Sequence, residues 1–146
     1  MNTKSSRIRR VLVVDDDPNL LANLAEGLEL IGGYEVIAAT NGVDGLEMFF
    51  QTLPDCVVAD VRMPGLNGYQ FVRALRGDPE TERIPLIILS ALVQEHEQLA
   101  GLFSGADAYL IKPVELRALV EAVERALRLT DAERLRALQD LSGREM

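Results

Sequence analysis

The sequence predicts an α/β protein built on a five-stranded parallel sheet with helices on both faces. Short apolar runs alternate along the chain with longer stretches in which hydrophobic residues recur at helical spacing. The short runs are continuous and rich in β-branched residues, which is typical of strands that are buried on both faces. Strands that alternate with helices form βαβ units, and these favour a parallel sheet with right-handed crossovers.

The first strand is expected at Val11–Val14, a β-branched run that ends in three acidic residues. Pro18 suits the first turn of the helix that follows, because its missing N–H is not needed there. Leucines at helical spacing extend this helix to Ile31, and the glycine pair Gly32 and Gly33 stops it. The second strand is expected at Tyr34–Ala39.

Asn41 is expected to cap the second helix, which Pro54 breaks. Hydrophobic residues at helical spacing are expected on the inner face of this helix. They are Val43, Leu46, Phe49 and Phe50.

The rest of the chain continues the alternation of strand and helix. The expected strands are Cys56–Ala59, Leu86–Leu89 and Tyr109–Ile111, and the expected helices are Gly68–Arg76, Glu95–Ser104 and Glu115–Leu127.

Polar side chains end four of the five strands. Asp15 to Asp17 follow the first strand, Asp60 the third, Ser90 the fourth and Lys112 the fifth. Ligands of open parallel sheets bind beyond the carboxyl ends of the strands. These side chains are therefore expected to converge on one edge of the sheet.

This set of residues suits chemistry on a phosphoryl group. Neighbouring carboxylates repel one another unless a cation joins them, and Mg²⁺ prefers carboxylate and carbonyl oxygens. An aspartate such as Asp60 can act as a nucleophile and form an acyl phosphate. Ser90 can donate a hydrogen bond to one phosphoryl oxygen, and Lys112 can bring positive charge to another.

Each residue also has a plainer interpretation. Asp17 can simply cap the helix that begins at Pro18, and Asp60 can be an acidic residue of a turn. Ser90 can cap a helix, and Lys112 can be a solvated lysine of a loop. The joint occurrence at the ends of four strands favours the functional interpretation.

Four motifs in this order resemble the receiver domain of bacterial two-component response regulators. The resemblance runs from Ile8 to Arg128. The motifs are VLVVDDDP at 11–18, DVRMPGLNG at 60–68, IPLIILSA at 84–91 and GADAYLIKP at 105–113. The resemblance implies a flavodoxin-like, doubly wound (βα)5 fold with the strand order 2-1-3-4-5.

The resemblance implies a role for each acidic residue of the site. Asp60 would accept a phosphoryl group from a sensor histidine kinase. Asp16 would bind Mg²⁺ directly, and Asp15 would act mainly through a metal-bound water. Asp60 and the backbone carbonyl of Arg62 would be further metal ligands, whereas Asp17 is left out of the metal site.

The resemblance also implies a switch. Ser90 would contact the phosphoryl group and Lys112 would pair with it, next to a cis peptide bond between Lys112 and Pro113. Tyr109 would turn inward as Ser90 moves toward the phosphate, which is a population shift between two packings. Such a protein is not an enzyme with a separate substrate, because it catalyses only its own phosphotransfer and dephosphorylation.

The expected organisation is a flexible tail at 1–7, a receiver domain at 8–128 and a helical extension at 129–146. The extension is expected either to pack on its own domain or to lead to an output domain that is absent here. The resemblance leaves a homodimer and a downstream effector open.

Composition excludes several other classes of protein. Acidic residues outnumber basic residues 23 to 15, for a net charge of −8, which argues against direct binding of nucleic acid. The single cysteine, Cys56, excludes a disulfide framework and favours a reducing compartment. No apolar run approaches the ~20 residues that span a bilayer. The sequence thus predicts a cytoplasmic protein that does not bind membranes.

Two other functions compete with the phosphorylated receiver. In a Mg²⁺-dependent phosphatase of the haloacid-dehalogenase type, Asp15 would be the nucleophile and Asp60 would have no clear role. The second competitor is a receiver-like interaction domain that never carries phosphate, although every residue of the site is present.

Overall fold

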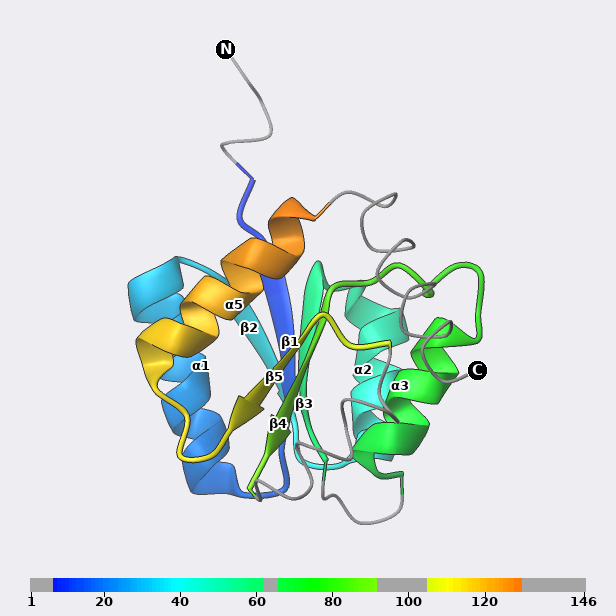
Figure 1. Cartoon of the computed structure of the whole chain (residues 1–146), viewed down its shortest axis with the longest axis horizontal. Helices are drawn as coiled ribbons and strands as arrows, with labels where there is room; N and C mark the ends of the chain where they lie inside the picture. The colour runs from blue at the N-terminus through cyan, green and yellow to red at the C-terminus, as the bar shows by residue number, and fades with distance from the viewer. Residues whose placement is uncertain (1–6, 62–65, 92–104, 130–146) are drawn as a thin grey trace, which may run out of the picture.

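The structure is a computed structural model that describes residues 7–61, 66–91 and 105–129 of the 146-residue chain. Five parallel strands form one sheet in the order β2-β1-β3-β4-β5. Helices α1 and α5 cover one face of the sheet, and α2 and α3 cover the other (Figure 1). The elements are β1 Arg10–Val14, α1 Pro18–Gly32, β2 Glu35–Ala39, α2 Gly42–Thr52, β3 Cys56–Asp60, α3 Gly68–Arg76, β4 Leu86–Ser90, β5 Ala108–Ile111 and α5 Leu116–Arg128.

The predicted flavodoxin-like fold and its strand order are confirmed. The predicted helix at 95–104 lies outside the described residues, as does the predicted extension beyond Leu129. Within the described part of the chain, none of the helices combines the length and the apolar character that a membrane span requires.

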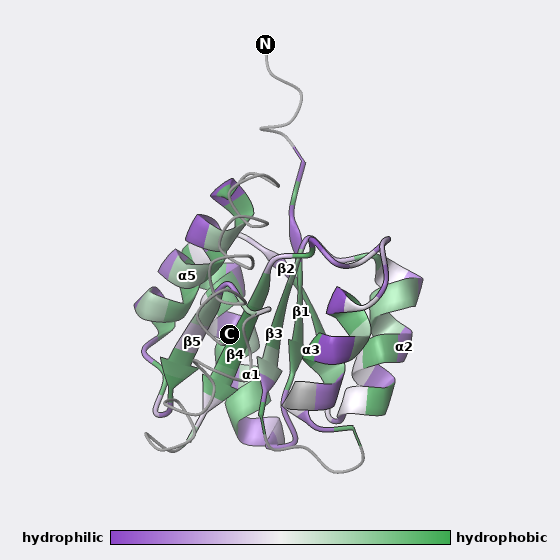
Figure 2. Cartoon of the chain, turned by 45° about the vertical axis from the view of Figure 1, so that its right-hand side comes forward, coloured by the Kyte–Doolittle hydropathy of each residue, from purple (hydrophilic) through white to green (hydrophobic). Residues whose placement is uncertain are grey.

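Alternate residues of each strand pack on opposite faces of the sheet. In β1, Leu12 and Val14 belong to the core on the α2 and α3 side, which contains Phe71. Val11 and Val13 belong to the core on the α1 and α5 side. Figure 2 shows the strands as mostly hydrophobic, whereas the helices also carry hydrophilic residues. Burial on both faces explains why the strands read as continuous apolar runs in the sequence.

The ends of α1 follow the predicted signals. The Asp17 side chain caps the helix by accepting hydrogen bonds from the backbone N–H groups of Asn19 (3.0 Å) and Leu20 (3.3 Å). At the other end, Gly33 adopts the left-handed region at φ 71°, and its N–H donates to the carbonyl oxygen of Glu29 at 3.1 Å. Glycine enters this region without the steric cost that a side chain brings.

The predicted inner face of α2 is partly wrong. Phe49 is buried, but Val43 is 58% exposed and Phe50 is 54% exposed. The residues of α2 that are buried are Gly42, Gly45 and Phe49. Leu46 is partly buried and packs against the core, as predicted. Successive residues of a helix are separated by about 100° of rotation, so Val43, after Gly42, and Phe50, after Phe49, turn toward solvent. Glycine carries no hydrophobic signal, and the apolar pattern alone therefore places Val43 and Phe50 on the inner face.

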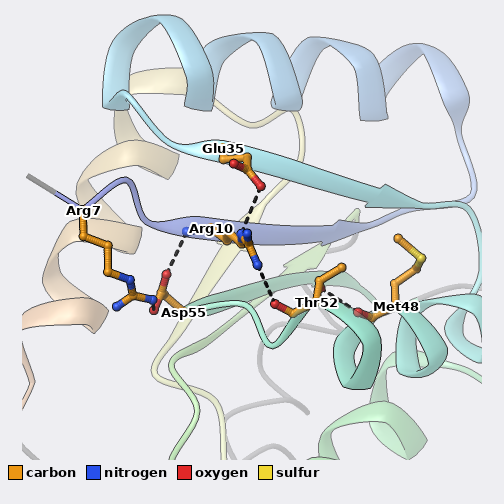
Figure 3. Close-up of polar contacts among 6 residues, drawn as sticks. All are labelled: Arg7, Arg10, Glu35, Met48, Thr52 and Asp55. Atoms are coloured by element: carbon orange, nitrogen blue, oxygen red, sulfur yellow. Dashed lines mark hydrogen bonds and ion pairs between the residues drawn. The ribbon is translucent and has the colours of Figure 1, made fainter.

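A cluster of hydrogen bonds and ion pairs connects the segments at the amino ends of the strands (Figure 3). Asp55 accepts a hydrogen bond from the backbone N–H of Arg10 at 2.8 Å and pairs with Arg7 at 2.6 Å. The Arg10 side chain pairs with Glu35 at 3.0 Å and donates to the carbonyl oxygen of Thr52 at 3.0 Å. These contacts join the start of β1 to β2 and to the α2–β3 connection.

Helix α5 returns the chain to this amino-terminal edge of the sheet. It follows β5 at the carboxyl edge and runs back along the sheet beside α1 (Figure 1). Gly27 of α1 lies against Leu116 of α5, and Gly32 lies close to Val120. The last described residue, Leu129, therefore lies at the edge opposite to the carboxyl ends of the strands.

Two leucines of α1 are expected to contribute very differently to stability, because one is buried and the other is exposed. Leu24 is fully buried, so Leu24→Ala is expected to lower the free energy of unfolding by about 2–5 kcal/mol. Leu30 is 76% exposed, so Leu30→Ala in the same helix is expected to change it by less than about 0.5 kcal/mol. Urea unfolding followed by circular dichroism measures both values, and equal losses would contradict the described packing.

Candidate functional site at the carboxyl edge of the sheet

The structure brings the predicted acidic residues together at one edge of the sheet. Asp15 and Asp16 follow β1, and Asp60 ends the neighbouring strand β3. One carboxylate oxygen from each of these three residues lies within 4.8 Å of the other two. Asp15 and Asp60 are buried, whereas Asp16 is exposed.

Lys112 reaches this acidic group from the end of β5. Its Nζ lies 3.0 Å from Oδ2 of Asp15, to which it donates a hydrogen bond, and 3.3 Å from Oδ2 of Asp60. The Lys112 side chain is 19% exposed, so both ion pairs lie in a largely dehydrated setting. The predicted cis peptide bond between Lys112 and Pro113 is confirmed.

The protonation of Lys112 reflects two opposing effects. Burial of the ammonium group lowers its pKa. The hydrogen bond with Asp15 and the negative charges of Asp60 and Asp15 raise the pKa more, so that it lies above the usual value for a lysine. Lys112 therefore remains a cation at neutral pH and neutralises part of the acidic group.

The donor set fits a hard divalent cation. At their formal charges, the three carboxylates and the Lys112 ammonium carry a net charge of −2, counted over the residues of the site that the structure describes. Carboxylate oxygens are the ligands that Mg²⁺ prefers, and Mg²⁺ usually keeps several waters beside one or two carboxylates. Asp15, Asp16 and Asp60 are the residues that could hold such an ion. Arg62, whose carbonyl was predicted as a further ligand, lies outside the described residues.

Asp17 is occupied by local structure, as its plainer interpretation predicts. Its side chain caps α1, and its backbone N–H donates a hydrogen bond to Oδ1 of Asp15 at 2.9 Å. Both oxygens of Asp15 thus have a partner, one in Asp17 and one in Lys112. This fixes the orientation of the Asp15 carboxylate.

The two residues of the predicted switch lie on neighbouring strands. Ser90 ends β4 and is fully buried, and its carbonyl oxygen accepts a hydrogen bond from the N–H of Lys112 at 2.7 Å. Tyr109 of β5 is half-buried and packs against the core on the α2 and α3 side. Burial, together with the charge of Asp107, raises the pKa of the Tyr109 hydroxyl, while the charge of Arg76 lowers it. The Tyr109 hydroxyl therefore stays neutral at physiological pH.

Gly68 shapes the site in a way that the sequence reasoning missed. A Cβ atom at Gly68 would lie 2.7 Å from the carbonyl oxygen of Asp60 and 2.7 Å from Cα of Val61. The first residue of α3 therefore packs directly on the backbone that carries Asp60. The glycine at the first position of the predicted helix, where most residues are tolerated, was the available signal of such a close approach.

The comparisons with known proteins identify the family. A model of the response regulator receiver domain matches residues 11–124, and the chain therefore belongs to this family of two-component signalling switches. Protein PilH of Pseudomonas aeruginosa is 42% identical over 118 residues, which are 81% of this chain and 97% of PilH. Transcriptional regulatory protein PrrA of Mycobacterium leprae is 44% identical over 119 residues, 82% of this chain but 50% of PrrA. The chain thus spans about half the length of PrrA.

Solved structures agree with this assignment. A response regulator receiver domain protein from Clostridium thermocellum has a TM-score of 0.74 at 31% identity, over 82% of this chain and 94% of that chain. The chemotaxis response regulator CheY4 of Vibrio cholerae has a TM-score of 0.74 at 28% identity, over 82% of this chain and 99% of that chain. The predicted resemblance to receiver domains is confirmed.

Two glycine substitutions test how tightly the backbone of Asp60 is held. Gly68→Ala is expected to lower the free energy of unfolding by about 1–3 kcal/mol, because the new methyl group meets rigid backbone. Gly27→Ala brings a methyl group within 2.8 Å of Leu116 Cδ2, the end of a flexible side chain. Alanine is also the better helix former by about 1 kcal/mol, so Gly27→Ala is expected to be neutral or stabilising. Chemical denaturation distinguishes the two, and a neutral Gly68→Ala would contradict the close packing.

Proposed function

We propose that this domain accepts a phosphoryl group on Asp60 from a sensor histidine kinase, in a reaction that requires Mg²⁺. The observation that carries the proposal is the position of Lys112, whose ammonium group contacts Asp15 and Asp60 where three carboxylates converge. Buried charges are costly, and an acidic group of this kind does not by itself stabilise a fold. Function is the better explanation for it.

The proposed transfer uses an Asp60 carboxylate oxygen as the nucleophile. A new O–P bond forms as the P–N bond of a phosphohistidine breaks, and the electron pair of the broken bond stays on the imidazole nitrogen, which takes a proton from solvent. Bound Mg²⁺ would supply positive charge against the phosphoryl oxygens. Asp15 and Asp16 would hold the ion with Asp60 and the carbonyl of Arg62, while Lys112 would pair with the phosphoryl group.

We further propose that Ser90 and Tyr109 convert phosphorylation into a change of conformation. Ser90 would hydrogen-bond a phosphoryl oxygen, and Tyr109 would favour its inward packing when Ser90 moves toward the phosphate. The burial of Ser90 at the end of β4 and the packing of Tyr109 beside it support this role. The domain would then be a switch and not an enzyme with a separate substrate.

The relatives offer two models for the wider organisation. PrrA is a transcriptional regulatory protein about twice as long as the matched region, and PilH is nearly covered by it. We propose that residues 8–128 form the receiver domain and that residues 129–146 either pack on it or lead to an output domain. A homodimer, a downstream effector and a cytoplasmic location remain predictions.

Chemical phosphorylation identifies the nucleophile. Incubation with acetyl phosphate or phosphoramidate and Mg²⁺ is expected to add one phosphoryl group, which mass spectrometry would map to Asp60. Asp60→Asn is expected to abolish this label, while Asp44→Asn, which changes an exposed acidic residue of α2, is expected to keep it. Label on Asp15 with rapid turnover would support the phosphatase instead. No label in the presence of Mg²⁺ would support a receiver-like domain that never carries phosphate.

Substitutions of the adjacent residues Asp16 and Asp17 test which carboxylates bind Mg²⁺. Asp16→Asn is expected to weaken Mg²⁺ binding about tenfold or more, because it removes a charged ligand. Asp17→Asn is expected to leave the affinity nearly unchanged, since asparagine caps a helix as well as aspartate does. Calorimetric titration with Mg²⁺ measures both affinities. Equal losses in the two variants would show that the general acidic field, and not specific ligands, binds the ion.

A further inference from the structure

Arg76, the last residue of α3, joins two segments that precede neighbouring strands. Its Nη1 donates hydrogen bonds to the carbonyl oxygens of Glu82 at 2.9 Å and Ile84 at 2.7 Å, just before β4. Its Nε donates to the carbonyl oxygen of Gly105 at 2.5 Å, just before β5. Only 11% of the Arg76 side chain is exposed, so water competes little for these hydrogen bonds.

Asp107 completes the arrangement from the β5 side. Its Oδ2 lies 3.6 Å from Nη2 of Arg76 and accepts a hydrogen bond from the backbone N–H of Leu86 at 2.8 Å. The N–H of Asp107 donates to the carbonyl oxygen of Leu86, also at 2.8 Å. We call this set of contacts the arginine clamp; its members are Arg76, Asp107 and the carbonyl groups of Glu82, Ile84 and Gly105.

The arginine clamp lies next to Tyr109 in both sequence and space. A Cβ atom at Gly105 would lie 2.8 Å from Cγ of Arg76, so this segment rests directly on α3. Tyr109 follows Asp107 by two residues and packs on the core to which Phe71 of α3 belongs. The charges of Arg76 and Asp107 both act on the Tyr109 hydroxyl: that of Asp107 raises its pKa and that of Arg76 lowers it.

We propose that Arg76 is a positioning residue for Tyr109, and that the arginine clamp favours the inward packing of that ring. This inference rests on the proposed function, in which Tyr109 is the aromatic switch. The planar guanidinium group of Arg76 reaches carbonyl groups of two segments at once, which the compact ammonium group of a lysine cannot do. A weaker arginine clamp would hold the segment from Gly105 to Tyr109 less firmly. It would not move the acidic residues of the proposed phosphorylation site, which follow β1 and β3.

Thermodynamic linkage gives the clamp an effect on the phosphorylation site. If phosphorylation favours inward Tyr109, then any contact that favours inward Tyr109 also favours the phosphorylated state by the same factor. A weaker clamp reduces the fraction of molecules that are ready for the phosphoryl group, and the apparent affinity falls with that fraction. Arg76 would thus tune the response without touching the phosphate.

Fluorine NMR of the full chain tests the inference. Labelling with 3-fluorotyrosine gives a signal for each of the three tyrosines, and Tyr109→Phe assigns the one that belongs to Tyr109. Arg76→Lys is expected to move this signal toward the position of free 3-fluorotyrosine. Arg73→Lys is the matched control, because Arg73 lies one turn earlier on α3 and is exposed. It is expected to leave the signal unchanged.

A second measurement links the clamp to the site. Beryllofluoride, an analogue of the phosphoryl group, is titrated in the presence of Mg²⁺. Arg76→Lys is expected to raise the midpoint about fivefold or more, which is the usual size of coupling between sites. Mg²⁺ affinity in the absence of beryllofluoride is expected to stay the same, which a general loss of structure would not allow.

Asp107→Asn provides an independent variant and carries the test if Arg76→Lys does not fold. It keeps an oxygen for the N–H of Leu86 but removes the charge that faces Arg76. It is expected to move the Tyr109 signal in the same direction. An unchanged signal in Arg76→Lys, or an equal change in Arg73→Lys, would overturn the inference. If the wild-type protein does not bind beryllofluoride, the proposed function fails, and the Tyr109 signal still decides whether the clamp positions the ring.

Discussion

The arrangement of the acidic residues depends on the ammonium group of Lys112, which lies 3.0 Å from Asp15 and 3.3 Å from Asp60. Like charges can be kept this close in a buried place only if an opposite charge stands between them. Lys112 comes from β5 and the two acids follow β1 and β3, so this contact spans most of the sheet. The strand order and the burial of both faces of the sheet hold the ends of β1, β3 and β5 at fixed positions relative to one another.

The two edges of the sheet differ in how their charged residues are paired. At the amino edge, Arg10 and Asp55 connect neighbouring segments through contacts that balance their charges. At the carboxyl edge, the three carboxylates outnumber the one cation, Lys112, that faces them within the described part of the chain. Between the two edges, alternate strand residues fill the apolar layers on the two faces of the sheet. The buried layers and the balanced amino edge stabilise the fold, and the excess negative charge at the other edge is what a bound cation would offset.

Much of this structure could be predicted from local signals. The strand ends at Asp60 and Ser90, the cap at Asp17 and the convergence of polar residues follow from apolar runs and from the rules of parallel sheets. Contacts between segments that are distant in the sequence could not be predicted from these local signals. Examples are the packing of Gly68 on Asp60 and the hydrogen bond from Arg76 to Gly105, because only the folded chain brings these residues together. The exposure of Phe50 could not be predicted for the same reason, because two glycines share the contact face of α2 with Phe49.

The direction of α5 has a consequence for how such a module can be combined with others. Because α5 carries the chain back to the amino edge, the end of this helix lies on the side of the molecule remote from Asp15, Asp16 and Asp60 (Figure 1). A second module joined directly after α5 would therefore start far from these three carboxylates. Its attachment would not require any change in the residues that surround them.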